Sequence, residues 1–146
     1  MVTTLDDAEA AAMPINTFPG SEAIAYYAEK IPGKPGVYDA KLHGAPDIVE
    51  IALSDGRKVP ADHRLLSKLI TSQPDYAGED IRLLSCSTGA TENGIAQRLA
   101  DKMGVAVEAS SDTLWIYSSG KTTIGPQAAD NTGSWVRFVP GGGTRP

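Results

Sequence analysis

The middle of the chain alternates short strand-like runs with amphipathic segments of helical period. Residues 37–42, 47–53, 81–86 and 105–109 read as strands, and residues 61–73 and 91–103 carry apolar side chains at helical spacing. Pro60 is expected to open the first of these helices, and Gly104 to end the second as its C-cap. The alternation predicts an α/β fold: a single layered domain with a mixed, mostly parallel sheet flanked by helices.

The segments on either side of this core extend the prediction to the whole chain. Residues 21–31 have helical spacing, Asp55-Gly56 marks a hairpin turn, a second hairpin is expected around residues 118–120, and residues 134–139 read as a last strand. Residues 1–20 are predicted to be a flexible arm and residues 141–146 a disordered tail. The 146 residues are therefore expected to form one α/β domain over residues 21–140.

Composition narrows the classes of partner. The net charge is −5 and the basic residues are scattered, so we expect no nucleic-acid partner. No apolar run approaches the ~20 residues of a membrane span, and the acidic N-terminus lacks the basic region of a cleaved signal peptide. Export would therefore need a specialised route. The two histidines have no metal-ligand spacing and there is no glycine-rich phosphate loop, so neither a metal nor a cofactor is expected.

The single cysteine ends the strand in IRLLSCSTGA, residues 81–90. Cys86 has no partner for an internal disulfide, so it is either an inert buried thiol or a reactive one. His43, followed by Gly44, ends another strand. Because ligands bind at the carboxyl ends of strands in α/β sheets, we expect Cys86 and His43 to face each other across a crevice. An imidazole beside a thiol can generate the thiolate, which is the nucleophile.

Plainer interpretations stand beside this one. Cys86 alone is more often a packed small residue, and His43 alone is more often a turn residue held by the backbone. His63 begins an amphipathic helix and is expected to be a solvated surface group. The strand before His43 alternates polar and apolar residues and reads as half exposed, whereas a central parallel strand is usually apolar on both faces.

Several segments resemble known families. LHG at residues 42–44 and LLSCSTG at residues 83–89 resemble the caspase-like cysteine peptidases of clan CD, in which His-Gly follows one strand and Cys follows another. VYDAKLHGAPD, IRLLSCSTGA, GIAQRLADKMGVAVEASSDTLWIY and GSWVRFVP resemble C-terminal toxin domains of bacterial Rhs-type and other polymorphic toxins. The likeness covers roughly residues 36–140, and it implies a caspase-like fold.

The resemblance also implies roles for individual residues. His43 would be the general base or ion-pair partner, Cys86 the nucleophile, and the backbone N–H groups of Gly44 and Cys86 the oxyanion hole. Substrate would be bound by the segment after the next strand, through Ser110, Ser111, Asp112 and Trp115. Asp112 would read a basic side chain or, equally, cap a turn beside Thr113. Trp115 would contact substrate or, more simply, pack in the core.

The expected function is that of a secreted bacterial toxin or effector domain. Its Cys-His pair would act as a cysteine peptidase-like hydrolase on an amide or acyl bond of a protein substrate in the target-cell cytoplasm. The toxin resemblance implies a cognate immunity protein as a further partner. The alternatives are a non-catalytic binding module on the same fold, a Cys-His glutamine deamidase, and another class of toxin enzyme.

Overall fold

The computed structural model describes residues 31–52, 57–117, 120–127 and 129–141, and the strand backbone at residues 2–3, 12–14 and 143–145. The predicted helix at residues 21–31 lies outside the described residues except for Ile31. The predicted turn at Asp55-Gly56 and residues 118–119 of the second turn also lie outside them.

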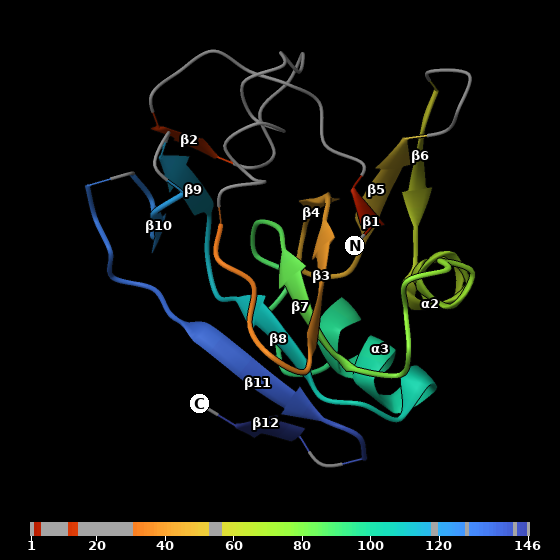
Figure 1. Cartoon of the computed structure of the whole chain (residues 1–146). Helices are drawn as coiled ribbons and strands as arrows, with labels where there is room; N and C mark the ends of the chain where they lie inside the picture. Colours follow the sequence, from red (N-terminus) through yellow and green to blue (C-terminus); the bar gives the residue numbers. More distant parts are fainter. Residues whose placement is uncertain are drawn as a thin grey trace.

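A six-stranded mixed sheet forms the centre of the fold (Figure 1). Its strands, in spatial order, are β1 (Val2–Thr3), β3 (Val37–Lys41), β7 (Asp80–Leu84), β8 (Val107–Ser110), β11 (Trp135–Val139) and β12 (Gly143–Arg145). The first four pair in parallel, whereas β11 is antiparallel to both β8 and β12. The α/β class with a mixed, mostly parallel sheet is therefore confirmed.

Two small antiparallel sheets flank the upper ends of β3 and β7 in Figure 1. One contains β10 (Thr122–Ile124), β9 (Leu114–Tyr117) and β2 (Ala12–Pro14), in that order. The other contains β4 (His43–Gly44), β5 (Val49–Ala52) and β6 (Lys58–Ala61). The antiparallel pairing of β5 with β6 and of β9 with β10 agrees with the two predicted hairpins.

Short strands also lie in the segments predicted to be an arm and a tail. Within residues 1–20, β1 pairs with β3 and β2 pairs with β9, and the remaining residues lie outside the described part. Within residues 141–146, β12 pairs with β11. The described backbone in both segments thus contributes edge strands.

The helix α2 (His63–Thr71) begins three residues later than Pro60, so the prediction that Pro60 opens it is wrong. Pro60 instead lies in the edge strand β6, where the missing N–H of proline is tolerated. The N-cap is Asp62, whose Oδ1 accepts the backbone N–H groups of Arg64 and Leu65 at 3.0 and 3.1 Å.

The helix α3 (Ile95–Met103) confirms the predicted C-cap. Gly104 has a φ of +71° and donates its N–H to the Ala100 carbonyl, as a left-handed glycine cap does. The helix starts later than the predicted residue 91, because Gly94 is its N-cap. Neither described helix is long and apolar enough to cross a membrane.

The two faces of the central sheet have different covers. Both described helices pack on one face, and this larger core contains Tyr38, Ala40, Leu42, Leu66, Ile70, Ile81, Leu83, Ile95, Leu99, Val107, Ala109 and Phe138. The opposite face carries a smaller apolar cluster with the β9–β10 hairpin, made of Ile31, Leu84, Cys86, Leu114, Ile116 and Ile124, with Trp135 packed against it. Among the described residues, helices therefore flank only one face.

The prediction that the strand before His43 is half exposed is wrong. Asp39, Lys41 and His43 share the face opposite the helices, yet Lys41 is 2% and His43 3% exposed. Asp39 lies opposite Arg82 in the β3–β7 register and accepts two hydrogen bonds from its guanidinium, at 2.7 and 2.8 Å. The alternation thus reflects polar groups paired inside the protein.

We predict that Asp39→Asn lowers the free energy of unfolding by about 3–5 kcal/mol, because the guanidinium of Arg82 stays buried without its carboxylate. Urea denaturation measures this. The matched control is Lys34→Ala, which removes the more exposed Lys34–Glu108 ion pair and should cost less than about 1 kcal/mol. Equal losses in the two variants would contradict the prediction.

Candidate functional site

The ladder between β3 and β7 brings His43 alongside Cys86. The last paired residues are Lys41 and Leu84, and the Leu42 N–H extends the ladder by donating to the Leu84 carbonyl at 3.2 Å. Carried on by one further residue pair, this register sets His43 opposite Cys86, with backbones about 5 Å apart. This register predicts both side chains on the face away from the helices, at one end of the sheet.

Gly44 shows how tightly the two segments approach. A Cβ built on Gly44 would lie 2.6 Å from Thr88 Cγ2, 2.9 Å from Ser85 Cβ and 3.0 Å from the carbonyl oxygen of Cys86. Only glycine fits such a contact. The His-Gly dipeptide is therefore required here by packing, and it presses directly on the turn that carries the thiol.

The turn after β7 is fixed by hydroxyl groups. Ser85 Oγ and Thr88 Oγ1 are 2.8 Å apart, and the Ser110 hydroxyl donates to the Ser85 carbonyl; all three residues are fully buried. Ser87, directly after Cys86, has a φ of +59°, a left-handed conformation that costs free energy in a residue other than glycine. The buried hydrogen bonds thus hold a sharp backbone turn next to the sulfur.

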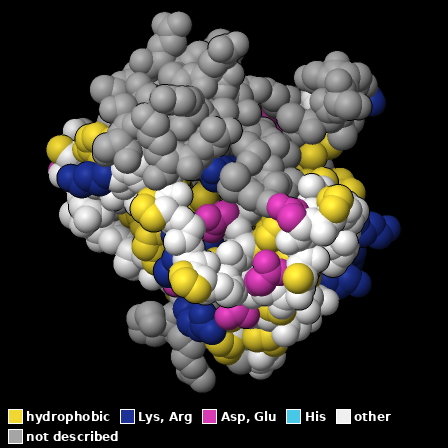
Figure 2. Space-filling model, viewed as in Figure 1, with side chains coloured by type: hydrophobic (Ala, Val, Ile, Leu, Met, Phe, Trp, Pro, Cys, Tyr) yellow, Lys and Arg dark blue, Asp and Glu magenta, His cyan; other side chains and the backbone are white. Residues whose placement is uncertain are grey.

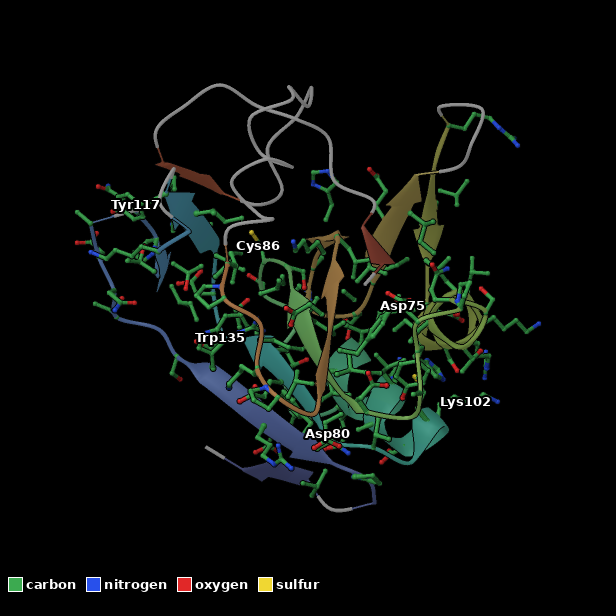
Figure 3. The ribbon with its side chains drawn as sticks, viewed as in Figure 1. Asp75, Asp80, Cys86, Lys102, Tyr117 and Trp135 are labelled. Atoms are coloured by element: carbon green, nitrogen blue, oxygen red, sulfur yellow. The ribbon has the colours of Figure 1, made fainter. Side chains whose placement is uncertain are left out.

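Cys86 lies at the opposite end of β7 from Asp80 (Figure 3). It is 5% exposed and belongs to the aliphatic cluster that includes Leu84 and Leu114. The Leu114 N–H donates to Cys86 Sγ at 3.4 Å, and the Cys86 thiol donates to the Leu114 carbonyl oxygen at 3.9 Å. A backbone N–H aimed at sulfur favours the thiolate, whereas an aliphatic surround favours the thiol.

A cavity of about 210 Å³ adjoins the site on the side of the small β4–β5–β6 sheet. His43, Gly44, Val49, Glu50 and Pro60 line it, together with Ala45 and Ile48. Cys86 is not among the lining residues. The structure therefore opens this hollow on the imidazole side of the pair.

The predicted substrate segment packs against the turn that bears the thiol. The Ser87 N–H donates to the Asp112 carbonyl at 3.0 Å, and the Gly89 N–H donates to the Ser110 carbonyl at 2.8 Å. The Ser110 side chain is fully buried, and Ser111 Oγ accepts the Ser134 N–H at 3.0 Å. These serines therefore support the loop.

The hydrogen bonds of Asp112 and Trp115 agree with the structural roles considered for them, a turn cap and a packed side chain. Asp112 Oδ1 accepts the Thr113 N–H at 2.7 Å, as a turn-capping aspartate does. Trp115 is partly buried, pairs with Thr123 across the β9–β10 hairpin, and donates its indole N–H to the Gly125 carbonyl at 2.9 Å. Both side chains thus have structural partners, and the Asp112 backbone also contacts Ser87, the residue after Cys86.

The second histidine lies elsewhere, at the first turn of α2. His63 is partly buried, and this burial lowers its pKa from the ordinary 6.5; Asp62 acts in the opposite direction, and Arg64, Arg98 and Lys102 lower it further. These cations belong to the helical layer. On the face shown in Figure 2, basic side chains are interspersed with acidic ones, without a continuous basic stripe in the coloured part.

The match of a family model decides where this chain belongs. The model described as "Domain of unknown function (DUF8616)" matches residues 13–124, which is most of the chain. The chain is a member of the DUF8616 family. Comparison with curated proteins and with solved structures found no match. The matched segment of DUF8616 contains both members of the Cys86–His43 pair and ends with the last residue of β10.

Two residues of the DUF8616 site were missed by the sequence reasoning. Lys41 is a buried lysine on the same strand face as His43, two residues before it. Glu50 is paired with His43 across β4 and β5. In the sequence, the position of Glu50 between the apolar residues Val49 and Ile51 indicates that its side chain points away from the core. Only the pairing of β4 with β5 shows that it faces His43. Over the residues described, no group of three or more His, Cys, Asp or Glu could hold a metal ion.

We predict that Gly44→Ala destabilises this DUF8616 protein by about 1–3 kcal/mol, because the new methyl group overlaps Thr88 and Ser85. The control is Gly33→Ala, since a Cβ at Gly33 meets nothing within 4 Å. Thermal unfolding of both variants gives the comparison. If Gly44→Ala unfolded at the same temperature as the wild type, the close approach of Gly44 to the turn after β7 would be contradicted.

We also predict that His63 titrates below the ordinary value of 6.5, chiefly because of its burial. The folded state then holds the proton less readily than the unfolded state, so this contribution to stability is lost as the pH falls from about 6.5 through the lowered pKa. NMR titration of the two imidazoles, assigned with His63→Asn, measures the pKa. In addition, His63→Asn should lose less stability than the wild type between about pH 7.5 and pH 5. A pKa above 6.5 would contradict the assignment.

Proposed function

We propose that this DUF8616 protein is a thiol enzyme in which Cys86 attacks an amide or acyl carbon and His43 transfers the proton. The observation that carries the proposal is the β3–β7 register, which the hydrogen bond from Leu42 to Leu84 extends past Lys41 and Leu84. One more pair in this register would set His43 opposite Cys86. Two further features support it. Gly44 contacts the turn of Cys86 directly, and the Leu114 N–H points at the sulfur.

The reaction follows from the pair. His43 removes the thiol proton, the sulfur of Cys86 bonds to the carbonyl carbon, and the carbonyl oxygen becomes an oxyanion. The backbone N–H groups of Gly44 and Cys86 are proposed to stabilise that oxyanion. The bond to the leaving amine then breaks as His43 returns the proton to the nitrogen, leaving a thioester. Water hydrolyses the thioester, and the free thiol is restored.

Peptide cleavage, glutamine deamidation and acyl transfer share this thioester and differ in the substrate and the final acceptor. We place substrate recognition on the segment next to the Cys86 turn, with Asp112 as the residue that reads a basic side chain and Trp115 as an apolar wall. Ser111 and Ser110 hold that segment in place through hydrogen bonds with Ser134 and Ser85.

The wider setting of the proposal comes from the resemblance of residues 36–140 to caspase-like peptidases and polymorphic toxin domains. In that setting the chain is a bacterial effector domain, exported by a specialised system and acting on a protein in the target-cell cytoplasm. Its producer would need an immunity protein that binds the Cys86–His43 edge. The net charge of −5 favours a basic surface on that partner.

A second candidate is a non-catalytic binding module. It is favoured by the 5% exposure of Cys86 and by its aliphatic neighbours Leu84, Leu114 and Ile116. In this case the cysteine is a packed small residue and His43 a buried polar group of the fold. The two candidates differ in one measurable property, the pH at which the single thiol becomes nucleophilic.

We predict that Cys86→Ala and His43→Ala each reduce the toxicity of the expressed chain, or its turnover once a substrate is found, by about a thousandfold or more. His63→Ala is the matched control, because it removes the other imidazole and leaves the Cys86 edge unchanged. Circular dichroism shows whether the variants fold. Full activity in folded Cys86→Ala or His43→Ala would end the enzymatic proposal.

Alkylation separates the two candidates without a substrate, because the chain has one cysteine. The midpoint of the pH–rate profile with iodoacetamide reports the thiolate and, unlike the absolute rate, does not depend on access to the sulfur. An enzyme predicts a midpoint well below about 8.5 that rises in His43→Ala. A binding module predicts a midpoint near or above about 8.5 in both proteins.

A further inference from the structure

Glu50 faces His43 from the side opposite Cys86. The residues His43 and Glu50 are direct partners in the antiparallel β4–β5 ladder, so their side chains leave the sheet on the same face. The neighbours of Glu50 in β5, Val49 and Ile51, are 2% and 5% exposed and belong to the core beneath the helices. Because side chains alternate along a strand, Glu50 points away from that core and toward the imidazole.

Burial and shape agree with this placement. Glu50 Oε1 and both ring nitrogens of His43 are buried atoms, and no hydrogen bond joins the two side chains in this geometry. Both side chains line the cavity of about 210 Å³, with Pro60 as the cross-strand neighbour of Glu50 on its other side. An imidazole and a carboxylate whose facing atoms are buried interact more strongly than they would in water.

His43 thus pairs with Glu50 in one ladder and lies two residues beyond the last paired residue of the other. The β3–β7 ladder, continued past Leu42, sets Cys86 on one side of His43, and the β4–β5 ladder sets Glu50 on the other. We propose that Glu50 is a positioning residue whose carboxylate turns to accept a hydrogen bond from one ring nitrogen of His43, which directs the other nitrogen toward the Cys86 sulfur. This inference rests on the proposed function and extends the pair to a Cys86–His43–Glu50 triad.

The carboxylate has two physical effects on the imidazole. It fixes the tautomer and the orientation of the ring, and it stabilises the imidazolium that forms when the thiol gives up its proton. The other charged groups on this face of β3 and β7 are Lys41, the Asp39–Arg82 pair and, at the far end of β7, Asp80. The positive charge of Lys41 opposes protonation of His43, and the negative charge of Glu50 offsets that effect.

The decisive variant is Glu50→Gln, which keeps the shape of the side chain and removes its charge. We expect the pH midpoint of Cys86 alkylation to move upward by about one unit, so that the rate near pH 6.5 falls about tenfold. The matched control is Asp47→Asn, an exposed carboxylate of the same β4–β5 connection, which should alkylate like the wild type. Glu50→Asp, which retains the charge, should restore most of the reactivity at low pH.

A second measurement uses the imidazole itself. In a Cys86→Ala background, the pKa of His43 measured by NMR should fall when Glu50→Gln is added, and the wild-type protein should show a hydrogen-bonded ring N–H proton. This proton needs no variant, so the test stands even where Glu50→Gln does not fold. Absence of the proton from the wild-type spectrum would overturn the inference.

The outcomes distinguish this inference from the function on which it rests. If His43→Ala raises the alkylation midpoint and folded Glu50→Gln leaves it at the wild-type value, the Cys86–His43 pair stands and the role of Glu50 is refuted. If the wild-type midpoint already equals that of an ordinary thiol and His43→Ala does not move it, the proposed function fails and the triad with it.

Discussion

The hydrogen bond from the Leu42 N–H to the Leu84 carbonyl carries the ladder of β3 and β7 one step beyond the last paired residues. The features of the proposed site follow from that step. It aligns His43 with Cys86, brings Gly44 onto the turn after β7, and starts β4 at the point where the chain leaves the central sheet. Backbone pairing, which does not depend on side-chain identity, thus sets the geometry of the proposed Cys86–His43 pair.

Much of the fold could be predicted from the sequence because its signals are local. Alternating strands and helices gave the α/β class, and Gly104 gave the end of α3. The prediction for Pro60 was wrong for a physical reason. Proline is favoured at the first position of a helix and is also tolerated in an edge strand, so the local sequence is the same in the two cases. Only the pairing of Pro60 with Glu50 shows that it lies in a strand. The edge strands β1 and β12 are only two and three residues long, so no local sequence pattern predicts them.

The residues of the candidate site also differ in how far local sequence patterns could predict them. His43 and Cys86 were singled out because each follows a strand-like run in the sequence and precedes small residues. In the structure His43 begins β4 rather than ending a strand, and Cys86 lies two residues after β7. Lys41 and Glu50 were not singled out, since their importance lies in what faces them. A lysine in an alternating strand normally marks a solvated face, yet this face is covered, and Lys41 is 2% exposed. The β9–β10 hairpin that covers this face also surrounds Cys86 with aliphatic side chains, which oppose ionisation of the thiol.

Leu42 is the single residue between β3 and β4, and its side chain is fully buried under the helices. Because side chains alternate along an extended chain, one residue more or fewer at this point would turn the imidazole to the wrong side of the sheet. We therefore expect homologous chains to keep the same number of residues between Lys41 and His43. An alignment of the family should show no insertion or deletion between these two residues.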